Sequence, residues 1–196
     1  MRKILILLLT VSMLFIIIGV LPVHGETELY ENVLRLHVIA NSDSDEDQQL
    51  KLKVRDAILS ECGHLFSDCK SKNEAQNTVE KNLSLIESTA KKTLLSYGCD
   101  HGVSVSLGEE TYPTRSYGSI CFPAGDYLSL RIIIGEGTGQ NWWCVLFPPM
   151  CMSAASYTDT NVSVPVGLTA EQYKLITKTN EPKYNIRFKI LEAFSS

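Results

Sequence analysis

The spacing of apolar positions changes several times along the chain, and each change predicts a different element. Arg2 and Lys3 precede residues 4–21, which are almost entirely apolar. A basic start followed by an apolar run is typical of a secretory signal, although this run approaches the length that a membrane-spanning helix needs. We therefore expect residues 1–25 to be either a signal peptide or an uncleaved N-terminal membrane anchor, and we exclude them from the fold.

The next segment alternates between two faces, as a β-strand does. In residues 33–41, the even-numbered side chains are apolar, whereas Arg35 and His37 lie on the other face. A polar turn follows, in which a serine can cap a helix and the carboxylates of residues 45–47 favour its first turn. Apolar residues at helical spacing then extend this predicted helix over residues 45–62.

One more strong helix follows before the pattern changes to strand-like alternation. The spacing of Val79, Leu83 and Ile86 is helical, and Gly98 is suited to end that helix. Pro148 and Pro149 end the last clear strand, because proline cannot continue a ladder. In order, the predicted elements are a helix at 73–97, strands at 103–107, 128–134 and 142–147, a short helix at 169–177 and a strand at 184–194, with an exposed loop at 152–165.

One strand, two helices and then a run of strands predict an α+β fold. We expect a two-layer arrangement in which a mostly antiparallel or mixed sheet carries the two longer helices on one face. Residues 26–196 are numerous enough to bury a core of their own. We therefore expect them to form a single extracytoplasmic domain.

The charge balance excludes one class of function. The chain has 18 basic and 22 acidic side chains, and removing residues 1–25 takes away two bases and no acid, which leaves a net charge of −6. A dedicated nucleic-acid binder normally shows a basic surplus instead. All six cysteines follow residue 25, and an even number outside the cytoplasm permits disulfides, although the pairing stays open.

The sequence contains no complete motif for catalysis or metal binding. The acidic residues 43–47 resemble the start of a calcium loop, but the positions that need glycine and glutamate are Gln48 and Val54. The glycines at 135–139 follow a strand but precede another strand, which favours a hairpin turn over a phosphate-binding loop. We therefore expect no catalytic residues, no metal and no cofactor, while a nucleophilic pair of Cys144 or Cys121 with His37 is left open by composition alone.

An unusually aromatic strand is the most distinctive feature of the chain. Trp142 and Trp143 must face opposite sides of a strand, so both are buried only where both faces are covered. If the helices cover one face, one tryptophan projects toward solvent, a partner or a membrane, and tryptophans are favoured interface anchors. The alternative is a central strand between two layers.

Three segments of the chain are distinctive when taken together. The first reads LHVIANSDS at 36–44 and LKLKVRD at 50–56. The second contains YPTR at 112–115, YG at 117–118 and PAGDY at 123–127. The third runs from GEG at 135–137 to NWWCVLFPP at 141–149 and Cys151. Together they resemble the stage II sporulation protein R family. The resemblance covers residues 34–151 and returns weakly near 187–189, whereas residues 152–182 match nothing and their role stays open.

The resemblance implies a signalling protein rather than an enzyme. Members of that family are exported from the forespore into the space between forespore and mother cell. There they trigger a membrane-embedded aspartic-type protease that processes the sigma-E precursor. The extracytoplasmic part of that protease is therefore the expected partner. The candidate contacts are Arg35, His37, Asn41 and Asp43 at the outer face and end of the first strand, with Trp142 and Trp143, followed by Arg115 and Tyr117. Within the third segment, Cys144 and Cys151 are candidates for a disulfide.

Two other functions stay open at this point. One is a secreted hydrolase of cell wall or peptides with Cys144 as nucleophile. The other is an envelope module that tethers proteins without signalling. For the candidate contacts, the alternative role is structural, with Asn41 and Asp43 as turn and cap residues and the two tryptophans in the core.

Overall fold

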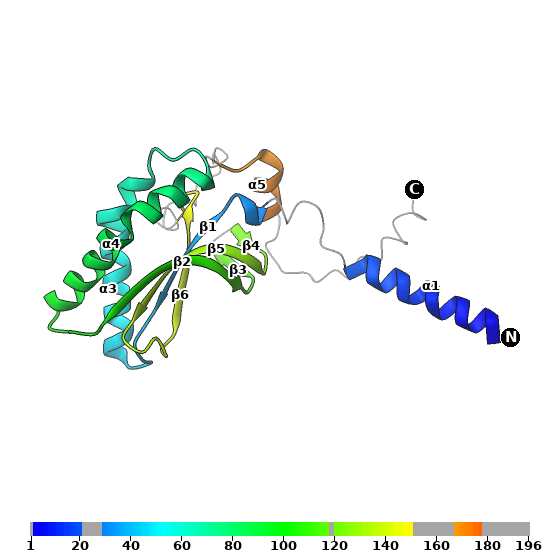
Figure 1. Cartoon of the computed structure of the whole chain (residues 1–196), viewed down its shortest axis with the longest axis horizontal. Coiled ribbons are helices and arrows are strands. Elements are labelled where there is room, and N and C mark those ends of the chain that lie inside the picture. Colours follow the sequence, from blue (N-terminus) through cyan, green and yellow to red (C-terminus); the bar gives the residue numbers. More distant parts are fainter. Residues whose placement is uncertain (1, 21–28, 118–119, 151–166, 178–196) are drawn as a thin grey trace.

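The structure is a computed structural model that describes residues 2–20, 29–117, 120–150 and 167–177. Helix α1 (Arg2–Val20) is drawn apart from the folded domain (Figure 1). Across the described ranges, no helix combines the length and the apolar character that a membrane crossing requires. The export signal or anchor over residues 1–25 stays a prediction.

A four-stranded mixed sheet forms the centre of the domain (Figure 1). Its strands lie in the order β2 (Val103–Tyr112), β5 (Gly125–Ile134), β1 (Leu34–Ile39) and β6 (Asn141–Phe147). The inner strand β1 pairs in parallel with β5 and antiparallel with β6, and β2 pairs antiparallel with β5. All six residues of β1 are buried, which accords with its central position.

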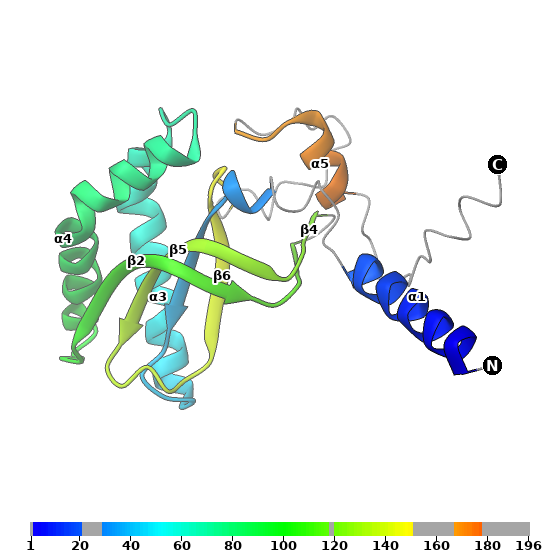
Figure 2. The same cartoon turned by 45° about the vertical axis from the view of Figure 1, so that its right-hand side comes forward.

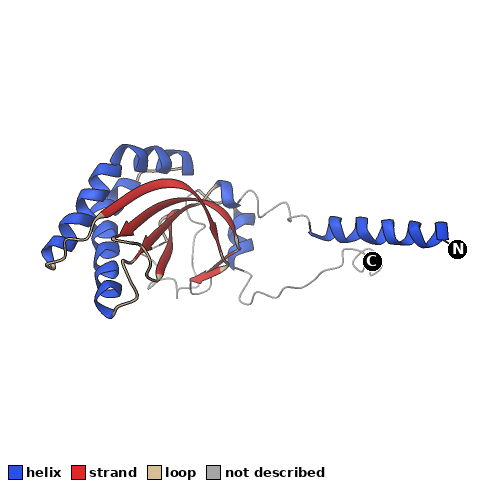
Figure 3. Ribbon diagram, turned by 60° about the horizontal axis from the view of Figure 1, so that its bottom comes forward, coloured by secondary structure: helices blue, strands red, loops and turns tan. Residues whose placement is uncertain are grey.

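Two helices cover one face of this sheet, as predicted (Figure 3). They are α3 (Asp45–Cys62) and α4 (Lys72–Ser96), joined by the short 3₁₀ helix η1 (Gly63–Phe66). Ser44 and Ser71 cap them, because each hydroxyl accepts a backbone N–H in the first turn. Their apolar faces pack on the alternating apolar positions of the strands to form the larger core, which includes Leu36, Val54, Val79, Ile86, Leu130 and Ile132.

The opposite face of the sheet is covered as well, so the expected two-layer arrangement is incomplete. A small hairpin of β3 (Arg115–Tyr117) and β4 (Ile120–Phe122) and the helix α5 (Ala170–Thr177) lie on that side (Figure 2). They enclose a second core that includes Tyr112, Phe122, Tyr127, Val145, Leu168 and Ile176. This second core decides which candidate residues remain at the surface.

Most elements agree with the sequence pattern. Both long helices, the strand at 33–41 and the short helix at 169–177 are confirmed within a few residues. The strands β3 and β4 and the helix η1 were not predicted, because three or four residues are too few to show a period. The predicted loop at 152–165 and strand at 184–194 lie outside the described residues.

Candidate functional site

Arg35 lies at the centre of the face opposite the helices and is completely buried. Its Nε donates to the carbonyl of Cys144 (3.1 Å), and its Nη2 donates to the hydroxyl of Tyr117 (2.9 Å). The expectation that Arg35 is exposed on the outer face of the first strand is therefore wrong. It fails because the hairpin β3–β4 and α5 cover that face.

Aromatic rings surround the buried guanidinium in place of a carboxylate. The Cζ atom of Arg35 lies 4.2 Å from the ring centroid of Tyr112 and 4.9 Å from that of Tyr127. Burial raises the pKa of Tyr112 and of Tyr117, so both phenols stay neutral at physiological pH. The faces of such rings attract a cation, and they stabilise Arg35 here although its Nη1 has no hydrogen-bond partner in the described ranges. Arg35 thereby holds the hairpin onto the sheet.

His37 is also buried, with 8% of its surface exposed, which again corrects the expectation of an outward-facing residue. Its Nδ1 donates to the carboxylate of Glu110 (3.1 Å), and its Nε2 lies 2.8 Å from Oδ1 of Asn141. Burial alone raises the pKa of Glu110, but hydrogen bonds from His37 and Ser129 and the nearby Arg131 outweigh it, so the pKa lies below its usual value. The pair connects β1 to β2 across β5.

The two tryptophans lie on opposite faces of the outer strand β6 and are both half-buried. Trp142 packs against the helix-side core, with Arg55 of α3 5.0 Å from its ring centroid. Trp143 packs against the second core, where its ring centroid lies 5.5 Å from that of His37. The alternative of a strand between two layers is confirmed in that both faces of β6 are covered. Its central position is not, because β6 is the outer strand of the sheet among the described residues.

A surface groove of about 540 Å³ gathers half of the predicted contact residues. The guanidinium of Arg115 lies 3.9 Å above the ring of Trp143, and the hydroxyl of Tyr117 donates to the carbonyl of Trp143 (3.1 Å). Of the eight candidates, Arg115, Tyr117, Trp142 and Trp143 therefore form one surface. Ser116, Gln140 and Asn141 complete the lining.

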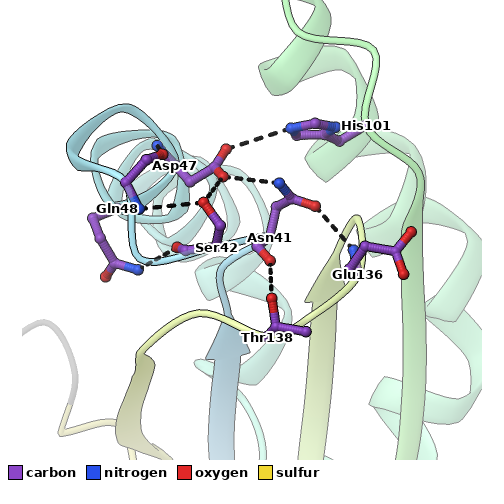
Figure 4. Close-up of polar contacts among 8 residues, drawn as sticks. Asn41, Ser42, Asp47, Gln48, His101, Glu136 and Thr138 are labelled. Atoms are coloured by element: carbon purple, nitrogen blue, oxygen red, sulfur yellow. Dashed lines mark hydrogen bonds and ion pairs between the residues drawn. The ribbon is translucent and has the colours of Figure 1, made fainter.

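Asn41 lies in a separate network at the end of β1 (Figure 4). Asp43 lies in the same turn and bonds to Gln140. Asn41 donates to the carboxylate of Asp47 (2.8 Å) and accepts from the backbone of Glu136 (3.0 Å). Hydrogen bonds from Ser42 and Asn41 hold the pKa of Asp47 below its usual value. The structural role considered for Asn41 is thus present, whereas its contact with a partner stays a prediction.

This network adjoins the groove at Gln140. The backbone N–H of Gln140 donates to Asp43 (2.8 Å), while its carbonyl accepts from the buried Nζ of Lys51 (2.9 Å). The cap of the helix itself is Ser44 and not Asp43. Asp43 is exposed and fixes the turn that leads into β6.

The cysteines and histidines do not form a catalytic pair among the described residues. Cys144 is disulfide-bonded, and Cys62, Cys69, Cys99 and Cys121 are free. In the β1–β6 register, Cys144 is opposite Leu36 and therefore faces the helices, whereas His37 is opposite Trp143 on the other face. Cys151 lies outside the described ranges. No cluster of ligands suited to a metal occurs in the part of the chain that the structure describes.

Comparison with known proteins now assigns the chain to a family. The sequence profile described as stage II sporulation protein R (spore_II_R) matches residues 30–157, which is more than half of the chain. The chain belongs to the stage II sporulation protein R family. It is 42% identical over 121 residues to the stage II sporulation protein R of Bacillus subtilis (strain 168), over 62% of this chain and 54% of that relative. The chain thus spans about half the length of that stage II sporulation protein R. No solved structure is significantly similar to it.

The assignment to the stage II sporulation protein R family confirms the resemblance carried by the aromatic strand. It supports a role in sporulation, and the family is named for that process and not for an enzymatic activity. The profile includes the groove and the buried residues beneath it. Sequence reasoning missed Glu110 and Tyr112 as members of this site, and their signal was a carboxylate and a tyrosine at alternate positions of one strand.

Proposed function

We propose that this protein is an exported sporulation signal. In this proposal it crosses the forespore membrane and acts in the intermembrane space on a membrane-embedded aspartic-type protease of the mother cell. That protease then processes the sigma-E precursor. Membership of the stage II sporulation protein R family is the observation that carries the proposal.

The groove supplies a surface for such a partner. It combines two half-buried tryptophans with an arginine, the residue types that dominate the binding energy of protein interfaces. Activation then requires that the protein bind the active state of the protease more tightly than the inactive state, since a ligand shifts an equilibrium only by its differential affinity. We propose that the active state so favoured is a dimer of the protease.

Reconstitution in a host that makes no spores tests this function. The full chain, the protease and the sigma-E precursor are produced together, with the chain directed to the extracytoplasmic side. Cleavage of the precursor that depends on the chain is the expected result, and a protease lacking its catalytic aspartates is the control. Binding without cleavage would instead identify a tethering module.

The hydrolase alternative gains nothing from the structure. A thiolate nucleophile must be free, and Cys144 is disulfide-bonded and faces away from His37. Replacing Cys144 by serine in the same reconstitution separates the two functions. A hydrolase would lose its activity entirely, whereas an activator keeps it to the extent that its fold survives loss of the disulfide.

A further inference from the structure

The groove lies between two strand edges. One wall is β3, and the other wall is the first half of β6. In the described part of the chain, β3 pairs only with β4, and β6 is the outer strand of the main sheet. All three residues of β3 line it, together with Asn141, Trp142 and Trp143 of β6. An uncovered strand edge presents backbone N–H and C=O groups that can pair with another extended segment.

The backbone of β6 is oriented for such pairing. The carbonyl of Val145 accepts from the backbone N–H of Met150 (3.3 Å) and not from β1, so it points to the outer edge of the sheet. In an antiparallel strand the N–H and C=O of one residue point to the same side, and residues two apart share that side. Trp143 and Asn141 therefore both direct backbone groups to the outer edge of the sheet.

The charge of the groove is opposite to that of the protein. Arg115 is the only charged residue among the described residues that line it, and no carboxylate is among them. The chain as a whole carries a net charge of −4. The guanidinium carbon of Arg115 lies 3.9 Å from the ring centroid of Trp143, and its buried Nε has no hydrogen-bond partner among the described residues. A planar guanidinium fixed in this way is suited to a carboxylate, which it can bind through two parallel hydrogen bonds.

We propose that this groove binds an extended acidic segment of a partner protein. The segment pairs with the edge of β6, places a carboxylate on Arg115 and packs apolar groups on Trp142 and Trp143. The identity of the partner rests on the proposed function, in which the segment belongs to the extracytoplasmic part of the protease. The mode of binding rests on the groove itself.

The test compares the full chain with two charge-reversed variants. Arg115→Glu places a negative charge in the groove, and Lys81→Glu makes the same charge change on the exposed side of α4, away from the groove. Each protein is applied to an array of overlapping 12-residue synthetic peptides that cover the extracytoplasmic segments of the protease. The expected result is binding to acidic peptides that Arg115→Glu weakens about 30-fold and Lys81→Glu leaves unchanged.

A second measurement keeps the test decisive if Arg115→Glu does not fold. For the unchanged chain, the binding of acidic peptides is measured at salt concentrations of roughly 50 mM and roughly 500 mM. Binding is expected to weaken at the higher concentration, because salt screens the attraction between charges at a surface. Three results would overturn the proposal. They are binding that does not depend on salt, preferential binding to uncharged or basic peptides, and self-association of the chain through the groove.

The same variants in the reconstitution separate the two proposals. If the unchanged chain triggers no cleavage but still binds acidic peptides through Arg115, the proposed function fails and the groove stands. If the Arg115→Glu variant triggers cleavage as well as the unchanged chain does, the groove proposal fails and the function stands.

Discussion

His37 on β1 and Glu110 on β2 form a hydrogen-bonded pair across the strand between them, with Nδ1 and Oε1 3.1 Å apart. The pair lies next to Trp143 and Asn141, so it supports the inner wall of the groove. A carboxylate that is partly buried and bonded in this way is stabilised in its charged form. The folded state therefore depends on that charge.

Replacing Glu110 by glutamine is expected to lower the free energy of unfolding at pH 7 by about 1–2 kcal/mol. The pKa of Glu110 is lower in the folded than in the unfolded state, so its stabilising contribution is present above the unfolded pKa and is lost as pH falls through the folded pKa. Urea unfolding at pH 7 and at about pH 3.5 measures this. The variant should lose less stability on acidification than the unchanged protein, and Glu109→Gln, on the exposed side of the same strand, should behave like the unchanged protein.

Replacing Arg35 by alanine is expected to destabilise the domain by about 2–4 kcal/mol, because the change removes buried hydrogen bonds and leaves a cavity among aromatic rings. Arg35→Lys keeps the charge but cannot reach Cys144 and Tyr117 together. Its stability should therefore lie between that of the unchanged protein and that of Arg35→Ala. Hydrogen exchange of residues 115–117 and 120–122 is the more specific measurement. Unchanged protection of that hairpin in Arg35→Ala would show that Arg35 does not hold it.

Two glycine substitutions test the turn between β5 and β6. A Cβ atom at Gly139 would lie 2.2 Å from the backbone oxygen of Ser42, so Gly139→Ala forces the turn to move and should cost about 1–3 kcal/mol. At Gly108 a Cβ meets nothing within 4 Å, so Gly108→Ala is the matched control. Thermal unfolding of both variants measures the difference. Equal transitions would mean that the turn accommodates a methyl group.

Trp143→Ala tests the contact role of the aromatic strand. Under the proposed function, the variant should trigger far less cleavage of the sigma-E precursor in the reconstitution, because Arg115 loses the ring that positions it. Trp142→Ala is the companion variant, since Trp142 also lines the groove but packs on the helix-side core and Arg55. Thermal unfolding followed by far-ultraviolet circular dichroism checks that each variant is folded. Normal processing by a folded Trp143→Ala variant removes Trp143 from the contact residues.

The elements that could be predicted are those long enough for their apolar spacing to repeat several times. The helix stripe through Val79 and Ile86 and the alternation in β1 both extend over enough residues to define a face. What could not be predicted is which face of β1 is covered. The hairpin that buries Arg35 comes from residues about 80 positions later in the chain, and Tyr117 lies 82 residues from Arg35.

The groove could be predicted only in part, for a related reason. The two tryptophans stand out in the sequence, and Arg115 and Tyr117 belong to a segment that resembles the family. Their meeting depends on β3, whose three residues show no periodicity. Glu110 was missed because an acid in a strand is usually a solvated side chain. Its bond to His37 depends on β5, which lies between β2 and β1 in the sheet.

The central position of β1 constrains the order in which the protein can assemble. This strand is made before the other strands of the sheet, yet its neighbours β5 and β6 end only at Ile134 and Phe147. A nascent chain that has been made only as far as α4 can form its two helices but has no strand to pair with β1. Folds dominated by such distant pairings form slowly. The sheet and the core packed on it can therefore form only late, after β6, which lines the groove, has been synthesised.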